Sequence, residues 1–286
     1  MLVVVVGLAC ALVYGAADFF GGQASRRVSP VRVVSLSAIV GLALMALFAL
    51  LLGGRMSDEA LLWGGLSGIA GSMAILTLYA ALAIGPMSIL SPLTAVISAL
   101  VPLSWGLLQG ERLSTLGYIA LGIALVAVVL VGFVPDKGAV RPRPRGIVLA
   151  TLSGVLIGVF LILVDRAPDD SGLLPLIFNR ITYLVVLWSI LLVMFIVARL
   201  RHSPPGPSVR PAIWLIVAAG MADSVANTLL LIGFRIGELS VVAVLTALYP
   251  AGTIALAAIV LKERIAPVQW VGLGLALAAA AMLAVA

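Results

Sequence analysis

Long runs of apolar residues, broken only by short polar turns, constrain this 286-residue chain more than any other feature. Hydrophobic residues make up 63% of the sequence and charged residues 10%, against about half and about a quarter in an ordinary soluble domain. A bilayer core about 30 Å thick needs about 20 apolar residues per helical span. The chain therefore has enough apolar sequence for about nine or ten spans, and its polar segments are too short to bury a separate soluble core.

Charged residues, prolines and glycines divide the apolar sequence into ten runs. The expected fold is therefore an all-α integral membrane protein with ten transmembrane helices. The expected helices are 2–22, 31–53, 60–84, 87–108, 114–134, 146–165, 174–198, 210–234, 239–261 and 266–285.

An internal repeat relates the two halves of the chain at a shift of 152 residues. When 85–127 is aligned with 237–279, about 13 of the 43 pairs are identical, where chance gives roughly a tenth. We predict two five-helix modules, 1–134 and 146–286, joined by the basic, proline-rich linker 135–145. Because five is odd, the second module enters the membrane upside down. Inverted repeats of this kind create two bundles whose rocking opens a midplane site to each side in turn.

Several short motifs occur in an order that resembles the EamA family of the drug/metabolite transporter superfamily. They are YGAADF at 14–19, Arg180 early in the seventh expected helix, GER at 110–112 and KER at 262–264. The resemblance covers essentially the whole chain. It implies ten helices in two five-helix repeats and a secondary carrier, commonly an exporter of amino acids, metabolites or drugs, with a cavity between the halves.

Lysine and arginine residues are unequally divided between the two sides that ten spans create. Twelve of the 17 lie on the side of the linker and five on the other. Short loops rich in lysine and arginine face the cytoplasm, so we expect the linker inside and both termini outside an inner membrane. The net charge of +6 then reflects orientation, and no nucleic-acid partner is expected.

The side chains that enzymes and metal centres need are nearly absent. The chain has one cysteine, Cys10, and one histidine, His202, which leaves no material for a histidine-based metal site or catalytic triad. We therefore expect no catalytic residue, metal or cofactor, and a membrane-embedded enzyme is disfavoured.

Polar side chains within the apolar runs are few, and such residues mark transport pathways because charge in hydrocarbon is costly unless paired or hydrated. Asp223 lies in the middle of the eighth expected helix, and Asn227 follows one turn later on the same face. Asp223 corresponds to Gly71 under the 152-residue shift, so the repeated scaffold does not require it. This favours a functional role over a hydrogen bond that only joins two helices.

Two further candidates combine a charge with an aromatic ring. Asp18 follows Tyr14 by one turn in the first expected helix. Its partner is a substrate amine, a proton or Arg180, and the alternative is an interfacial pair with a basic residue at 26 or 27. Arg180, with Tyr183 three residues later, holds a substrate carboxylate, neutralises a carboxylate of the protein, or extends to the lipid headgroups.

The fourth and ninth expected helices contain the most similar segment of the repeat, with Thr94 and Ser98 in one and Thr246 and Tyr249 in the other. Prolines are expected to interrupt both helices and free carbonyl groups that a neighbour, water or ligand must satisfy. These prolines are Pro92, Pro102 and Pro250. Matching kinks in two halves indicate a binding site or gate, and the alternative is a bend for packing.

Two other patterns predict contacts that hold the fold together. Two pairs of glycines have the spacing of close helix contacts. They are Gly64 with Gly68 and Gly154 with Gly158. Glu111 with Arg112, and the matching residues 263 and 264, predict local ion pairs that fix a turn.

The expected function is export of a small organic metabolite, such as an amino acid or drug-like compound, by alternating access. Because the chain contains no nucleotide-binding loop, the energy must come from a gradient, and we expect proton coupling through Asp223 or Asp18. The sequence leaves open two alternatives, an uncoupled facilitator and a lipid-moving or scaffold protein, and it does not identify the substrate.

Overall fold

The computed structural model describes residues 1–25, 27–84, 87–132, 143–201, 208–260 and 266–285. Every regular element in these ranges is helical. The α-helices are α1 (Leu2–Ser25), α2 (Pro30–Leu52), α3 (Asp58–Ile84), α4 (Met87–Leu108), α5 (Thr115–Gly132), α6 (Pro144–Asp165), α7 (Leu174–Leu200), α8 (Ile213–Ile236), α9 (Leu239–Thr246), α10 (Tyr249–Val260) and α11 (Pro267–Val285). Most of the predicted linker, His202 and the turn at 262–264 lie outside the described residues.

The predicted helices are confirmed within a few residues at each end, with one exception. The ninth expected helix, 239–261, forms two helices, α9 and α10, separated by Ala247 and Leu248, so the interruption expected at Pro250 is confirmed. Pro250 lacks the N–H that a continuous helix would use to bond the Thr246 carbonyl. Instead, the N–H of Leu248 donates to the Leu245 carbonyl at 3.1 Å, which tightens the last turn of α9.

The expected interruption of the fourth helix, in contrast, is wrong, because α4 continues through both of its prolines. Pro102 packs beside Gly158 of α6, where the missing side chain leaves room for the proline ring. The same proline signal therefore has opposite outcomes in the two halves.

Six helices are long and apolar enough to cross a membrane, namely α1, α2, α3, α6, α7 and α8. The remaining apolar helical stretches are 93–108, 115–131, 239–253 and 267–283. The all-helical membrane architecture is therefore established among the described residues, and the full count of ten spans stays a prediction.

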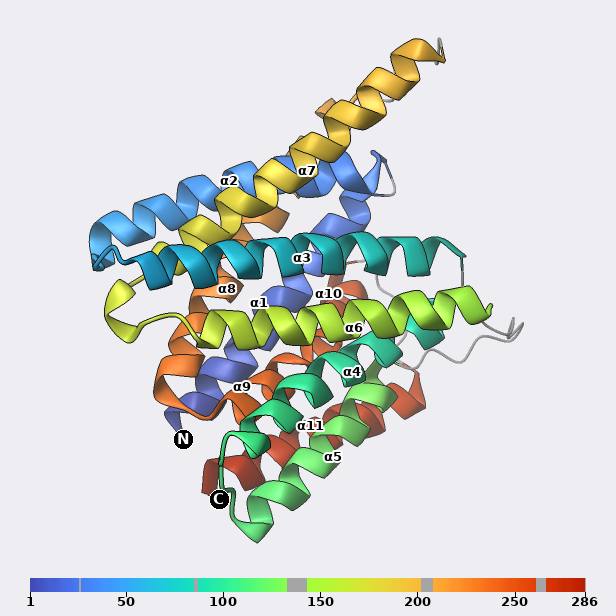
Figure 1. Ribbon diagram of the computed structural model, residues 1–286. Coiled ribbons are helices and arrows are strands. Elements are labelled where there is room, and N and C mark those ends of the chain that lie inside the picture. Colours follow the sequence, from blue (N-terminus) through green and yellow to red (C-terminus); the bar gives the residue numbers. More distant parts are fainter. Residues whose placement is uncertain (26, 85–86, 133–142, 202–207, 261–265, 286) are drawn as a thin grey trace.

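Helices from the two halves interleave (Figure 1). α3 packs against α6 and α7, and α8 packs against α1 and α2. α4 contacts α6 and α9, α1 contacts α9 and α10, and α5 lies beside α11. Each contact has a counterpart in which the halves are exchanged, so the two halves form one continuous bundle.

Glycines allow the closest of these crossings. A Cβ on Gly15 of α1 would lie 2.5 Å from the Tyr249 carbonyl oxygen and the Thr253 nitrogen of α10. Gly64 and Gly68 meet the backbone of α7 in the same way, and Gly154 and Gly158 meet the side chains of α4. The predicted close helix contacts are confirmed.

The bundle has two ends, which we name by their connections. The terminal end contains Met1 and the turns that leave α2, α4, α6 and α8, and the linker end contains the opposite helix ends (Figure 1). At the terminal end, the Arg55 N–H donates to the Asp170 carbonyl at 2.9 Å. At the linker end, Arg27 donates to the Pro211 carbonyl at 3.0 Å. Each bond joins two turns that the sequence placed on one side of the membrane.

Candidate functional site

A cavity of about 190 Å³ lies between the two halves of the bundle. Helices α1, α3 and α4 of the first half and α6 to α10 of the second contribute its walls. Eight of the nine side chains singled out from the sequence line it. They are Tyr14, Asp18, Arg180, Tyr183, Asp223, Asn227, Thr246 and Tyr249.

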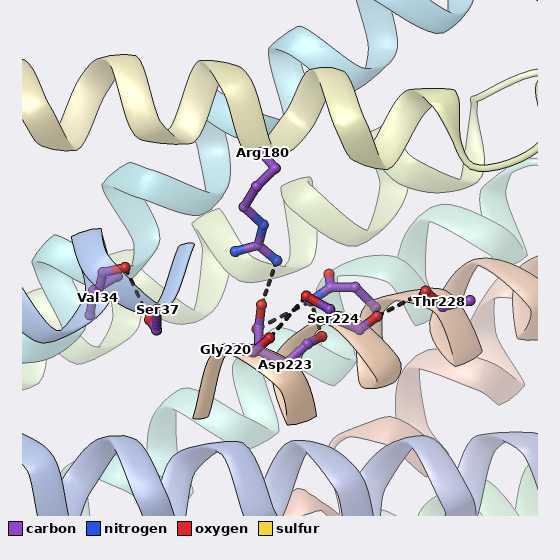
Figure 2. Close-up of polar contacts among 8 residues, drawn as sticks. Val34, Ser37, Arg180, Gly220, Asp223, Ser224 and Thr228 are labelled. Carbon is purple, nitrogen blue, oxygen red and sulfur yellow. Dashed lines mark hydrogen bonds and ion pairs between the residues drawn. The ribbon is translucent and has the colours of Figure 1, made fainter. Parts of the chain in front are cut away.

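An ion pair between Arg180 of α7 and Asp223 of α8 crosses one side of the cavity (Figure 2). Arg180 is 6% exposed, so it does not extend to the lipid headgroups. Asn227 donates to the Asp223 carboxylate at 3.2 Å and to its backbone carbonyl at 2.8 Å. The sequence left the partner of Arg180 open, and in the folded chain that partner is Asp223.

The guanidinium of Arg180 is held from several directions. Its Cζ lies 5.4 Å from the centre of the Tyr183 ring, within the range of a cation–π contact. Its Nε is buried and donates no hydrogen bond within the described residues. The preceding residue, Asn179, donates to Ser67 of α3 at 2.8 Å and fixes this turn of α7. Several contacts therefore position the ion pair, and Nε of Arg180 is left without an acceptor among the described residues.

Asp18 has a different environment from Asp223. It is exposed to the cavity from α1, one turn beyond Tyr14, and it makes no hydrogen bond or ion pair with any residue that the structure describes. The suggested partner Arg27 bonds the Pro211 carbonyl instead, and residue 26 lies outside the described residues. The cavity thus contains one satisfied carboxylate and one carboxylate that is open to a ligand or a proton.

Thr94 is the predicted residue that the structure does not bring to the cavity. It is fully buried, and its hydroxyl donates to the carbonyls of Leu90 and Ala150 at 3.0 and 3.1 Å. Ser98, one turn later on α4, lines the cavity instead. The sequence placed both hydroxyls in the repeated segment but did not fix the rotation of α4, which decides between them.

Sequence reasoning missed the apolar wall of the cavity. Ile157, Phe160 and Leu161 of α6 line the same cavity as the polar residues of α1, α7 and α8. Apolar residues are too common in this chain for any one of them to give a signal.

Glu111 does not form the predicted ion pair with Arg112. Its carboxylate accepts hydrogen bonds from the Ser240 hydroxyl and, at 3.4 Å, from the Ser240 N–H in the first turn of α9. A carboxylate at a helix N-terminus satisfies free N–H groups and the helix dipole. Burial, together with the nearby charge of Glu111, raises the pKa of Glu238 above its usual value of 4.5. The turn before α5 therefore fixes the start of the broken helix that reaches the cavity.

A comparison with known families matches residues 1–133 and 144–285 to one described as the EamA-like transporter family. The chain belongs to this family. The resemblance drawn from the short motifs is therefore confirmed, and so is the two-repeat organisation of an EamA-like transporter. Members of the family are transporters.

A comparison with solved structures shows that the fold is similar to a known one. A crystal structure described only as "Crystal structure of protein" aligns with this EamA-like transporter at a TM-score of 0.78 and 17% sequence identity, over 99% of this chain and 96% of the other. No curated protein matches the sequence.

Proposed function

We propose that this EamA-like transporter exports a small organic metabolite, such as an amino acid or drug-like compound, across the inner membrane by alternating access. The cavity between the halves is the cargo site. In this proposal ten spans form two inverted five-helix modules, 1–134 and 146–286, joined by the cytoplasmic linker 135–145. The observation that carries the proposal is that both halves build one cavity, which contains an ion pair and a carboxylate, Asp18, with no ion-pair partner among the described residues.

Paired contacts support the inverted arrangement. The Cys10 thiol of α1 donates to the Ala226 carbonyl of α8 at 3.3 Å, and the Ser153 hydroxyl of α6 donates to the Ala74 carbonyl of α3 at 2.9 Å. The two carbonyl residues, 226 and 74, correspond at an offset of 152, and the two donor residues, 153 and 10, at an offset of 143. The offsets differ because the connection between α7 and α8 is longer than that between α2 and α3. A two-fold exchange of the halves relates the two bonds.

The same exchange of halves pairs residues that line the cavity, and the paired residues indicate what kind of cargo the cavity would fit. A polar residue that lines the cavity in one half corresponds to an apolar or small residue that lines it in the other. The related pairs that line the cavity are Tyr14 with Ile157, Asp18 with Leu161, Asp223 with Gly71, and Asn227 with Ile75. A cargo with a charged or hydrogen-bonding group on one side and an apolar body on the other matches these walls.

A gradient supplies the energy in this proposal. Asp18 and Asp223 are the carboxylates among the described residues that line the cavity, and either one can exchange a proton for cargo as the cavity changes its access. The excess of basic residues at the linker end supports a cytoplasmic position for that end. The cargo then enters from the cytoplasm and leaves at the terminal end.

The test is a thermal-shift screen of the purified full-length protein against amino acids, amines and drug-like cations, followed by counterflow of each hit in proteoliposomes. A ligand of the folded state raises the melting temperature by mass action. We expect a hit that exchanges across the membrane and whose flux falls when the pH gradient is collapsed. Flux that ignores the pH gradient supports an uncoupled facilitator. Binding without any exchange contradicts the transport proposal.

A further inference from the structure

A second cavity, of about 540 Å³, lies between α4 and α6 and opens on the outer surface of the bundle. We call it the α4–α6 groove. Its apolar walls are Leu100, Val101 and Leu108 of α4 and Val159, Ile162 and Leu163 of α6. Among the described residues, it shares no lining residue with the cavity proposed as the cargo site. The groove is therefore a separate feature, on the other face of α6.

Glycines explain why the groove forms at this place. A Cβ on Gly154 would lie 2.7 Å from the Ile97 side chain, and one on Gly158 would lie 2.5 Å from that of Val101. α4 and α6 therefore approach most closely at these two glycines. Beyond them α6 continues with larger side chains, and the two helices diverge towards the terminal end (Figure 1). The space between the diverging helices is the groove.

The groove lies within one leaflet of the bilayer. It follows α4 from Leu100 to Leu108, the last residue of that helix. Eight residues of helix span about 12 Å, which is less than half of a bilayer core about 30 Å thick. Leu100 and Leu108 are 39% and 82% exposed. An apolar space of this kind is filled by hydrocarbon, because water would find no polar partners there. The groove is thus open to the lipid chains of the leaflet at the terminal end.

Polar groups lie at the mouth of this apolar groove. The Arg166 guanidinium, directly after α6, is 5.4 Å from the centre of the Trp105 ring, within the range of a cation–π contact. Tryptophan is enriched at the level of the lipid headgroups. Arg166 is exposed, and its side chain makes no hydrogen bond or ion pair with any described residue, the adjacent Asp165 included. Ser104 lines the groove beside Trp105, and within the described part of the chain its hydroxyl has no hydrogen-bond partner.

The repeated scaffold requires neither of these polar groups. At the offset of 143 that relates α1 to α6, Arg166 corresponds to Gln23. At the offset of 152 that relates the later helices, Ser104 corresponds to Leu256. The cation and the hydroxyl are therefore specific to the α4–α6 groove, which favours a ligand over a role in packing.

We propose that the α4–α6 groove binds an anionic phospholipid of the leaflet at the terminal end. One acyl chain lies between the apolar walls, Ser104 donates to an ester carbonyl, and Arg166 binds the phosphate. A guanidinium matches a phosphate in charge and geometry. A headgroup with net negative charge is favoured, because a basic residue near the membrane surface attracts anionic lipid. The inference concerns the surface that faces the membrane and does not rest on the proposed transport function.

Native mass spectrometry of the full-length protein in detergent tests the site, by titration with phosphatidylglycerol and with phosphatidylcholine of the same chains. Arg166→Gln removes the cation and Arg166→Lys keeps it. Arg55→Gln is the matched control, because Arg55 is also exposed at the terminal end but does not line the groove. Leu163→Trp fills the groove. A phosphatidylglycerol with a diazirine in one acyl chain, added at a few equivalents, locates the bound lipid by crosslinking.

We expect the wild type to bind phosphatidylglycerol more tightly than phosphatidylcholine. Arg166→Gln should weaken binding of phosphatidylglycerol about fivefold, as expected for one basic residue near a membrane surface. Arg166→Lys and Arg55→Gln should bind it as the wild type does. Crosslinks should fall on α4 and α6 and disappear in Leu163→Trp. Melting temperatures establish that each variant is folded. Arg166→Gln changes an exposed side chain, so it decides the question even if Leu163→Trp is unstable.

Three results would overturn the proposal. The first is equal binding of phosphatidylglycerol by the wild type and Arg166→Gln, or crosslinks scattered over the whole surface. The second is a dimer that Leu163→Trp dissociates, because the groove would then join two copies of the chain. The third is loss of the crosslinks when a ligand from the thermal-shift screen is added, which would assign the groove to cargo.

Discussion

The cavity walls from the two halves have matching backbone contacts and unlike side chains. Cys10 and Ser153 make equivalent hydrogen bonds, and Gly15 and Gly158 permit equivalent crossings. Yet Asp18 brings a carboxylate to the cavity, whereas its counterpart in the other half, Leu161, belongs to an apolar cluster. The repeated positions thus maintain the packing, and the positions that differ between halves supply the chemistry. Substitutions at the two kinds of position must therefore fail in different ways.

The largest effect is expected at Asp223, which has no charged counterpart in the first half. Asp223→Leu leaves the buried Arg180 without its partner and should cost about 3–5 kcal/mol of folding free energy. The double variant Arg180→Leu/Asp223→Leu should recover most of that stability, because it buries no charge, but should not recover counterflow. Unfolding in detergent with chemical denaturant measures the stability. Equal loss in the single and double variants would show that the ion pair has no special role.

Gly15 tests the matched scaffold. Gly15→Ala places a methyl group 2.5 Å from backbone atoms of α10, so α1 must shift, and we expect a loss of about 1–3 kcal/mol. Gly22→Ala is the matched control, because nothing lies within 4 Å of its Cβ position, and alanine favours a helix by up to about 1 kcal/mol over glycine. Melting temperatures compare the two variants. A Gly15→Ala protein as stable as the control would contradict the close crossing of α1 and α10.

Thr94 and Thr246 allow a smaller comparison, between a threonine that supports helix packing and one that lines the cavity. Thr94→Val loses two buried hydrogen bonds and should cost about 1 kcal/mol of stability with unchanged counterflow. Thr246→Val alters the cavity wall and should change the apparent KM for the ligand found in the screen. Counterflow of both variants in parallel measures the difference. A transport defect in Thr94→Val with normal Thr246→Val kinetics would reverse the assignment.

The smallest effect is expected outside the cavity. The pKa of Glu238 is raised in the folded chain, so the folded state binds this proton more tightly than the unfolded chain. Its contribution to stability therefore falls as the pH rises above 4.5. Because Glu238 is exposed, solvent screening limits the effect to a few tenths of a kcal/mol. Glu238→Gln should flatten the pH dependence of the melting temperature by that amount, and an unchanged pH profile would contradict it.

The sequence predicts most of the helices because apolar runs and their polar boundaries follow from membrane thickness alone. Eight of the nine candidate residues chosen from the sequence also line the cavity, because polar groups in hydrocarbon must face one another or water. The sequence predicts the break beside Pro250 but wrongly expects the same of α4 at Pro92 and Pro102, because proline tolerance depends on whether the neighbouring helix has a glycine opposite. It does not choose between Thr94 and Ser98, since helix rotation is set by packing.

The pairing of the charges is also beyond the sequence. Asp18 and Asp223 are both carboxylates in apolar helices, and only their positions in the fold give one of them Arg180 and leave the other open. The Glu111 contact with Ser240 joins residues 129 apart in the chain, so a local ion pair was the simpler expectation.

The central claim is that the two ends of one cavity open and close in opposite phase. Spin labels in the Cys10→Ser background test it by distance measurement, at Gly22 and Ala80 for the linker end and, in a second sample, at Arg166 and Ile236 for the terminal end. We predict two populations at each end, with acidic pH or ligand shortening the first distance and lengthening the second. A single distance at both ends under all conditions would contradict alternating access.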